Sequence, residues 1–267
     1  MPSAIARDRK LLLIVSFLLM SLGVRAQTFA DTLGLSVAQW QVAEGPQFIS
    51  VVAINPRHHR AGIGISPYMK SLSRLASEHR ALVAINGSYY NMSEGNSVCF
   101  LKVEDTVADS TESREFRIRV NGAIAVRKGK LRILPWTKTT ERNYKKKHGT
   151  VLASGPLLLQ NGHACDLSQC DSGFVYTRHT RSAIAITKKK QVLFITVDGR
   201  APQHAVGMSL PELAQLINQL GGVTAINLDG GGSTMLYLDG HILNHPTDNG
   251  RFDHEGERKI PNMIYFR

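Results

Sequence analysis

Short apolar runs separated by turn signals cover most of the chain. Several of these runs end in Asn-Gly, Lys-Gly or Asp-Gly pairs, which favour tight turns between strands. Apolar residues recur at helical spacing in two segments, 71–79 and 209–220, and Gly221-Gly222 ends the second. The pattern predicts an α/β domain of α+β-like character, with a mixed, strand-rich sheet and few helices. The predicted strands span residues 47–54, 81–85, 116–120, 123–126, 131–134, 183–187 and 192–197.

One unit in this pattern predicts where a site forms. The strand at 192–197 is followed by the helix at 209–220 and by an apolar strand at 223–228, the order of a strand-helix-strand crossover within a mixed sheet. Both strands of such a unit end at the same edge of the sheet, where ligands gather. We expect Asp198-Gly199-Arg200 and Asp229-Gly230-Gly231-Gly232 to meet there in one cleft.

The three consecutive glycines, Gly230, Gly231 and Gly232, favour a close approach of the backbone to another group. A wide turn between two strands is the alternative explanation. Because a strand-like segment follows at 235–238, the loop lacks the helix that nucleotide-binding loops require. Successive backbone N–H groups, with the hydroxyls of Ser233 and Thr234, still predict a cradle for an anion or for sugar oxygens.

Two arginines are candidates for binding a phosphate. Arg181 enters an apolar strand, and Arg200 lies next to Asp198. A planar guanidinium grips a phosphate through two hydrogen bonds, so two of them in one cleft suit a phosphodiester better than a neutral sugar. A structural ion pair with a nearby aspartate is the alternative for each.

Glu212 and three uncharged polar residues complete the candidate site. Ser209-Leu210-Pro211-Glu212 forms a capping box, so capping is the first expectation for Glu212 and catalysis is the second. Asn227 lies two positions before Asp229, on the same side of the strand. Asn86 and Tyr89 belong to a strand-to-turn segment that fits a sugar platform and ordinary loop packing equally well.

The N-terminal residues have the pattern of a secretory signal peptide. Arg7, Arg9 and Lys10 precede an apolar run from 11 to about 24, and Val24-Arg25-Ala26 places small residues at the cleavage positions. We expect residues 1–26 to be removed, which predicts an exported protein, periplasmic or extracellular and bacterial, with no stable membrane span. A retained signal anchor is the alternative.

The net charge of the chain indicates which kind of partner it binds. The 267-residue chain has a formal charge of +11, and removal of residues 1–26 leaves +8. A basic surplus favours anionic partners, among them phosphorylated or acidic glycans, nucleic acid and membrane surfaces. No aromatic residues are interleaved with the basic runs Lys145-Lys146-Lys147 and Lys188-Lys189-Lys190, so no nucleic-acid platform is expected. The second run is predicted to form a hairpin tip.

The cysteines exclude a disulfide scaffold, because the chain has only three of them. Cys165 and Cys170 are close enough in sequence to clip the loop between them, and a pairing of Cys99 with either stays open. No Cys/His spacing resembles a zinc site. The residues therefore require no cofactor, and a divalent cation is left open.

Seven segments, taken in order, resemble the phosphodiester glycosidase domain family. The resemblance runs from about residue 81 to the C-terminus. Residues 27–80 carry little of it, so we expect them to form an N-terminal segment packed on a main domain at 81–267. The family usually has proline before the arginine at 181 and threonine after it, where this chain has Thr180 and Ser182. The segments are 84–91, 154–158, 181–185, 197–200, 207–214, 225–234 and the pair Asn244-His245-Pro246 with Glu257-Arg258.

The resemblance implies a surface active-site cavity and hydrolysis of a sugar-1-phosphodiester at the glycosidic C–O bond, which gives free sugar and a phosphomonoester. In this hypothesis Arg181 and Arg200 hold the phosphodiester, and the glycine loop with Ser233 binds phosphate or sugar oxygens. Asp198 or Asp229 is the base or nucleophile. A departing phosphomonoester has a second pKa of about 6, so it leaves without a strong general acid.

Two other classes of protein could use the same residues. A metal-dependent phosphodiesterase would hold a divalent cation on the aspartates and cut the P–O bond instead. A non-catalytic binder of phosphorylated glycans would keep the cavity without turnover.

Overall fold

The apolar runs of the sequence form strands that are buried on both faces. In β14 (Val192–Val197) every residue is buried. Val192 and Phe194 point into one hydrophobic core, whereas Leu193 and Ile195 point into another on the opposite face. A strand covered on both sides needs no polar face, which is why it reads as a continuous apolar run.

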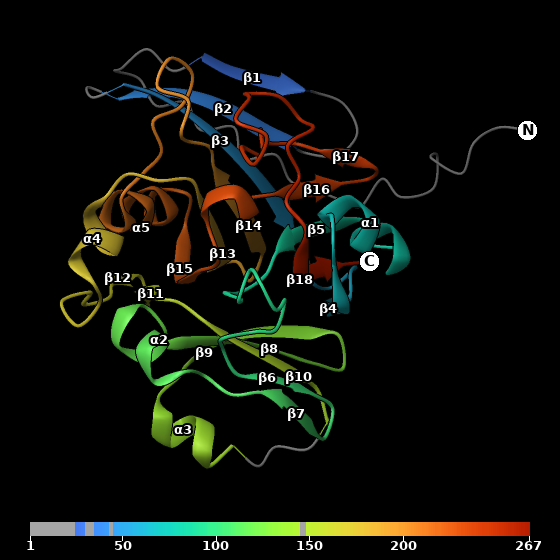
Figure 1. Ribbon diagram of the computed structural model, residues 1–267. Helices are drawn as coiled ribbons and strands as arrows, with labels where there is room; N and C mark the ends of the chain where they lie inside the picture. The colour runs from blue at the N-terminus through green and yellow to red at the C-terminus, as the bar shows by residue number, and fades with distance from the viewer. Residues whose placement is uncertain (1–24, 30–34, 43–44, 145–147) are drawn as a thin grey trace, which may run out of the picture.

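Three sheets surround the first of these cores in the computed structural model, which describes residues 25–29, 35–42, 45–144 and 148–267 (Figure 1). The first sheet has the order β1 (Arg25–Phe29), β2 (Leu35–Val42), β3 (Gly45–Ile54), β14, β13 (Arg181–Thr187), β15 (Gly222–Asn227), β11 (Leu157–Gln160), β12 (His163–Ala164). The second has the order β7 (Thr106–Asp109), β6 (Leu101–Val103), β10 (Thr150–Ser154), β8 (Gly122–Arg127), β9 (Lys130–Pro135). The third has the order β17 (His241–Ile242), β16 (Leu236–Leu238), β5 (Val83–Asn86), β18 (Ile260–Phe266), β4 (Ala61–Lys70).

Helices pack on the outer faces of the sheets. α5 (Leu210–Gln219) buries its apolar face against the first sheet, next to α4 (Ser172–Tyr176). α1 (Leu72–Glu78) packs on the third sheet. α2 (Ser113–Ile118) and α3 (Lys138–Arg142) flank a smaller apolar cluster around Trp136 on the second sheet. The strand-rich single domain with few helices is therefore confirmed, and no described helix is long and apolar enough to cross a membrane.

The predicted elements agree with the structure at all but one position. Both helices are present, and the segment 187–192 with its three lysines forms the turn between β13 and β14. The strand predicted at 116–120 is wrong, because this segment contributes to helix α2. Phe116, Ile118 and Val120 alternate as in a strand, but the buried Glu115 instead pairs with Arg119 one helical turn later, at 2.7 Å.

An additional strand lies between the two strands of the predicted crossover. β14 and β15 run in the same direction, as predicted, but β13 lies between them and pairs with both in antiparallel fashion. Every ladder between the described strands is antiparallel, so the parallel relation of β14 and β15 exists only across β13.

The N-terminal residues supply strands to two sheets. β3 pairs with β14 and β4 pairs with β18, so the segment 45–70 is built into the same sheets as the rest of the chain. The predicted signal peptide, apart from Arg25 and Ala26 in β1, and the run Lys145-Lys146-Lys147 lie outside the described residues. All three cysteines are free thiols, with Cys99 buried and Cys165 and Cys170 partly buried.

Candidate active site

Three strand ends meet at one edge of the first sheet. Arg181, the first residue of β13, is opposite Val197, the last residue of β14. Asn227, the last residue of β15, is opposite Ala183 of β13. The antiparallel β13 therefore brings its beginning to the two strands' carboxyl ends, and the predicted convergence of Asp198 and Asp229 on one edge is confirmed.

The glycine loop is packed against the segment that precedes β13. Thr180 Oγ1 donates a hydrogen bond to the carbonyl of Gly231 at 2.9 Å. A Cβ on Gly230 would lie 2.6 Å from the Thr180 carbonyl oxygen, so no larger residue fits there. Gly231 has φ +65°, and η2 (Gly231–Ser233) forms a single 3-10 turn before β16. The loop leads into a strand and not into a helix, as predicted.

Asp229 is held at the start of this loop. Its backbone N–H donates to the Gly87 carbonyl at 3.1 Å, and its Oδ1 accepts from the Gly230 N–H at 3.0 Å. Burial of the carboxyl raises the pKa of Asp229 to about 6, while Ser233, Arg119, the Gly230 amide and Arg258 oppose this shift. Asp229 is half-buried as a residue, and its carboxyl ionises close to neutral pH, which suits a base or nucleophile.

Ser233 provides a buried hydroxyl beside this carboxyl. The hydroxyl lowers the pKa of both Asp229 and Tyr90, so it lies within reach of these two groups. Thr234 Oγ1 is buried and has no hydrogen-bond partner among the described residues. The role of Ser233 as a donor to phosphate or sugar oxygens stays a prediction.

Arg258 is the cation that packs on the third glycine. Its Nε and Nη2 both donate to Oδ1 of Asp248, at 2.8 and 2.5 Å. A Cβ on Gly232 would lie 2.5 Å from Arg258 Nη2 and 2.6 Å from Asp248 Oδ1. This ion pair lies directly on the backbone of the loop, so a side chain at position 232 would have to displace it.

Arg200 lies on the second glycine, at the rim of the site. Its side chain is exposed, and its Nη2 lies 3.4 Å from His179 Nε2. A Cβ on Gly231 would lie 3.0 Å from the same nitrogen. Burial and the nearby Arg200 lower the pKa of His179. Arg200 therefore lies at the glycine loop, and its binding of a phosphate stays a prediction.

Arg181 has a different role from the predicted phosphate grip. Its side chain is buried; Nε donates to the Met208 carbonyl at 2.9 Å, and Nη2 donates to the carbonyls of Phe174 and Thr177 at 2.9 and 2.7 Å. These bonds occupy one edge of the guanidinium with backbone acceptors. We correct the prediction accordingly: Arg181 ties α4 and the start of α5 to β13.

Asp198 is also a supporting residue. Its carboxylate is fully buried and accepts hydrogen bonds from Asn244 Nδ2 at 3.1 Å and from the N–H and Nδ1 of His245, each at 2.9 Å. Burial raises the pKa of Asp198, whereas these hydrogen bonds lower it. Since a fully buried carboxylate does not reach substrate, the structure favours Asp229 over Asp198 as the reacting group.

Glu212 caps α5, as first expected. Its carboxylate accepts from the N–H and Oγ of Ser209 at 2.9 and 2.8 Å, and it forms an ion pair with Arg178. Both oxygens are therefore engaged at the helix end, and the geometry gives no support to a catalytic role.

Asn86, Tyr89 and Asn227 lie beneath the loop and not on its surface. Each is no more than 2% exposed. Asn86 Nδ2 donates to the Asp229 carbonyl at 2.7 Å, and Asn227 Nδ2 donates to Tyr89 Oη at 2.9 Å. The prediction that they contact substrate is corrected, because their hydrogen bonds hold the strand end that carries Asp229.

Sequence reasoning assigned no role to four residues of this edge: Arg119, Arg258, His179 and Tyr90. Arg119 lies 3.6 Å above the Tyr89 ring and lowers the pKa of Asp229. Burial raises the pKa of Tyr90, Asp229 raises it further and Ser233 lowers it. The pair Glu257-Arg258 was part of the family resemblance and was the one available signal for Arg258.

No group of three His, Cys, Asp or Glu suited to a metal ion occurs within the described part of the chain.

Comparisons with known proteins identify similar sequences and a similar fold. The phosphodiester glycosidase family model matches residues 79–267. The N-acetylglucosamine-1-phosphodiester alpha-N-acetylglucosaminidase of Mus musculus is 28% identical over 176 residues, which are 62% of this chain and 33% of the mouse protein. The Homo sapiens enzyme of the same name has the same identity and coverage. The match thus spans about a third of the length of these curated relatives.

A solved structure shows the same fold. The catalytic domain of the zebrafish N-acetylglucosamine-1-phosphodiester alpha-N-acetylglucosaminidase, auto-inhibited by its pro-peptide, superposes with a TM-score of 0.65 and 18% identity. The superposition covers 93% of this chain and 84% of that one. At this identity the likeness establishes the arrangement of the strands and not the chemistry.

Proposed function

This chain belongs to the phosphodiester glycosidase family, and on that premise we propose that it hydrolyses a sugar-1-phosphodiester at the glycosidic C–O bond. The observation that carries the proposal is the placement of Asp229. Its carboxyl ionises near pH 6 at the start of a glycine loop on which two cations, Arg200 and Arg258, are packed. A carboxylate beside two guanidinium groups suits attack next to a bound phosphate.

The proposed reaction needs few groups. Asp229 either removes a proton from the water that attacks the anomeric carbon, or attacks that carbon itself and forms a glycosyl ester that water then hydrolyses. The bond from the anomeric carbon to the phosphate oxygen breaks, and its electron pair leaves with the phosphomonoester. The phosphomonoester has a second pKa of about 6, so guanidinium groups that neutralise it replace the general acid of ordinary glycosidases. We assign the Ser233 hydroxyl, which lies beside Asp229, to a phosphate or sugar oxygen.

Substrate and location follow as parts of the same proposal. The names of the mouse and zebrafish enzymes specify N-acetylglucosamine-1-phosphodiesters, so this is the first substrate class to test. A phosphorylated glycan suits the basic charge of the chain. We propose export through the signal sequence at 1–26, which fractionation of the expressing cell and N-terminal sequencing of the mature protein would test.

Hydrolysis in heavy-oxygen water tests which bond is cut. Label in the released sugar supports the proposed C–O cleavage. Label in the phosphate, with activity lost on chelation and restored by a divalent cation, would establish a metal-dependent phosphodiesterase. Binding of the phosphodiester without turnover would establish a glycan-binding protein. Asp229→Asn must lose the activity, whereas Glu94→Gln, which removes an exposed carboxylate elsewhere, must retain it.

A further inference from the structure

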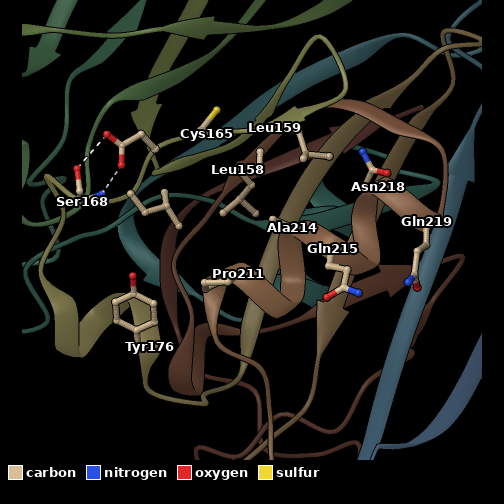
Figure 2. Close-up of a pocket in the computed structure, with 13 residues that line it drawn as sticks. Leu158, Leu159, Cys165, Ser168, Tyr176, Pro211, Ala214, Gln215, Asn218 and Gln219 are labelled. Carbon is tan, nitrogen blue, oxygen red and sulfur yellow. Dashed lines mark hydrogen bonds between the residues drawn. The ribbon is translucent and has the colours of Figure 1, made fainter.

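A hollow of about 560 Å³ lies along α5, outside the edge that carries Asp229 (Figure 2). We call it the α5 pocket. Its walls are α5, the end of β11, the loop 164–168 and the last residue of α4. None of its lining residues belongs to the glycine loop or contacts Asp229. The volume falls within the roughly 300–1,000 Å³ of small-molecule sites.

The lining combines an apolar floor with an exposed aromatic ring. Leu158 and Leu159 form part of the floor, and Pro211 and Ala214 form the α5 side. Tyr176 is 68% exposed, which is unusual for a large side chain that lines a pocket. In Figure 2 Tyr176 lies on one side of Pro211 and the amide side chains of α5 lie on the other.

Apart from Asp166, the polar groups of the α5 pocket are uncharged. Gln215 and Gln219 are four residues apart, on one face of α5. Asn218 donates to the Gly162 carbonyl at 2.8 Å. Asp166 is the only carboxylate in the lining, and both of its oxygens accept hydrogen bonds from Ser168. The lining has no lysine or arginine, although the chain has 32 of them, so the α5 pocket is not built for an anion.

We propose that the α5 pocket is a subsite for a neutral sugar ring of a glycan. The apolar C–H face of a pyranose packs on an exposed aromatic ring, and its hydroxyls pair with planar amides that donate and accept. Tyr176 supplies the ring, and Gln215 and Gln219 supply the amides. The proposal rests on the proposed function, because it extends the substrate from a phosphodiester to a glycan of more than one sugar.

The α5 pocket shares its supports with the candidate active site. Tyr176 lies between Phe174 and Thr177, whose carbonyls accept hydrogen bonds from Arg181. Pro211 follows Ser209 in the capped first turn of α5, next to Met208, whose carbonyl accepts from Arg181 Nε. A sugar bound in the α5 pocket therefore contacts the same two helices that Arg181 ties to β13.

Cys165 gives a direct readout of occupancy. It lines the α5 pocket as a partly buried free thiol, whereas Cys99 is fully buried. In full-length Cys170→Ser protein, the rate of Cys165 alkylation by iodoacetamide is measured by mass spectrometry, at alkaline pH because burial raises the pKa of this thiol. The probes are maltotriose and triacetylchitotriose at about 10 mM, above the millimolar Kd typical of a shallow site.

We expect at least one of the two sugars to slow alkylation several-fold. Tyr176→Ala must abolish this protection, and the matched variant Tyr68→Ala, which removes a tyrosine that is 80% exposed on β4, must keep it. Failure of both sugars to protect, or protection that survives Tyr176→Ala, overturns the proposal.

The outcome is separable from that of the proposed function. Protection is measured again in Asp229→Asn protein, where it must persist because no turnover is needed. Protection without any hydrolysis by the wild type would overturn the proposed function alone. Hydrolysis without protection would overturn the sugar subsite alone.

Discussion

Asp198 accepts hydrogen bonds from both the backbone nitrogen and Nδ1 of His245, each at 2.9 Å, although the two residues are 47 positions apart. Asn244 adds a third hydrogen bond and also donates to the Thr234 carbonyl, just after the glycine loop. Asp198 thus connects the end of β14 to the segment after β17 and, through Asn244, to the loop. These hydrogen bonds give the carboxylate a supporting role in the candidate active site.

Replacement of Asp198 by Asn therefore lowers the stability of the fold. The amide puts donors against the donors of His245 and Asn244, and we expect a loss of about 3 kcal/mol, as for other broken buried polar pairs. Urea unfolding measures it, with Glu94→Gln as the control for loss of an exposed carboxylate. If Asp198→Asn keeps full stability but loses turnover, a direct catalytic role would have to be restored.

Activity falls in acid as Asp229 is protonated. Burial raises its pKa to about 6, against about 3.9 for an exposed aspartate, and only the ionised form acts as base or nucleophile. We expect kcat/KM to fall about tenfold per pH unit below pH 6 and to level off above it. A phosphodiester does not titrate in this range, and circular dichroism at each pH controls for unfolding. A flat profile between pH 4.5 and 7 would contradict the assignment.

The same carboxyl makes the native protein less stable than it could be. Because its pKa is raised on folding, the stabilisation from proton uptake is complete below about pH 4 and is lost as the pH rises through 6. The ionised group then costs up to about 3 kcal/mol, by conversion of the shift at 1.36 kcal/mol per unit. We expect Asp229→Asn to be more stable than the wild type at pH 7.5 and equal to it near pH 4, in urea unfolding at both values.

Gly232→Ala tests the contact between the loop and Arg258. The new Cβ would overlap Arg258 Nη2 and Asp248 Oδ1, so the ion pair must move and kcat/KM should fall at least tenfold. In an Arg258→Ala background the same substitution should cost much less, because the overlapping group is gone. Equal losses in both backgrounds would show that Gly232 matters for another reason.

Arg200→Ala tests recognition of the phosphate. A lost charge-assisted hydrogen bond is worth about 1.5–3 kcal/mol, so we expect kcat/KM for the phosphodiester to fall about ten- to a hundredfold, with a weaker dependence on salt. Arg132→Ala, which removes an exposed arginine from β9, serves as the matched control. An unchanged kcat/KM would remove Arg200 from the site.

The sequence predicted the elements with clear periodicity and the edge at which they meet. Local pattern was sufficient to predict β13, β14, the capped α5 and the turns around them. These elements depend on residues that are adjacent in the sequence. The strand predicted at 116–120 failed because a period of two in a short segment also fits a helix whose charged pair, Glu115 and Arg119, is held by tertiary contacts.

Local sequence could not predict which residues of the site react and which only support it. Asp198 and Asp229 each follow an apolar strand and precede glycine, so their local sequences are alike. His245 and Asn244 occupy the carboxylate of Asp198 with hydrogen bonds, whereas Ser233 and the nearby Arg258 leave the carboxylate of Asp229 available. Such long-range contacts decide which carboxylate reacts, and a single sequence does not contain them. Arg181 was misjudged for the same reason, since its acceptors are backbone carbonyls.

The position of β18 has a consequence for how the protein is made. This strand is the last in chain order, yet it lies between β4 and β5 and pairs with both. During synthesis β4 has no partner strand in the third sheet until residues 260–266 emerge, and β5 meanwhile presents one unpaired edge. The loop that carries Asp229 is anchored to Gly87, just after β5, and so becomes rigid only after this late step. We therefore expect the glycine loop to reach its native geometry only after β18 has been inserted between β4 and β5.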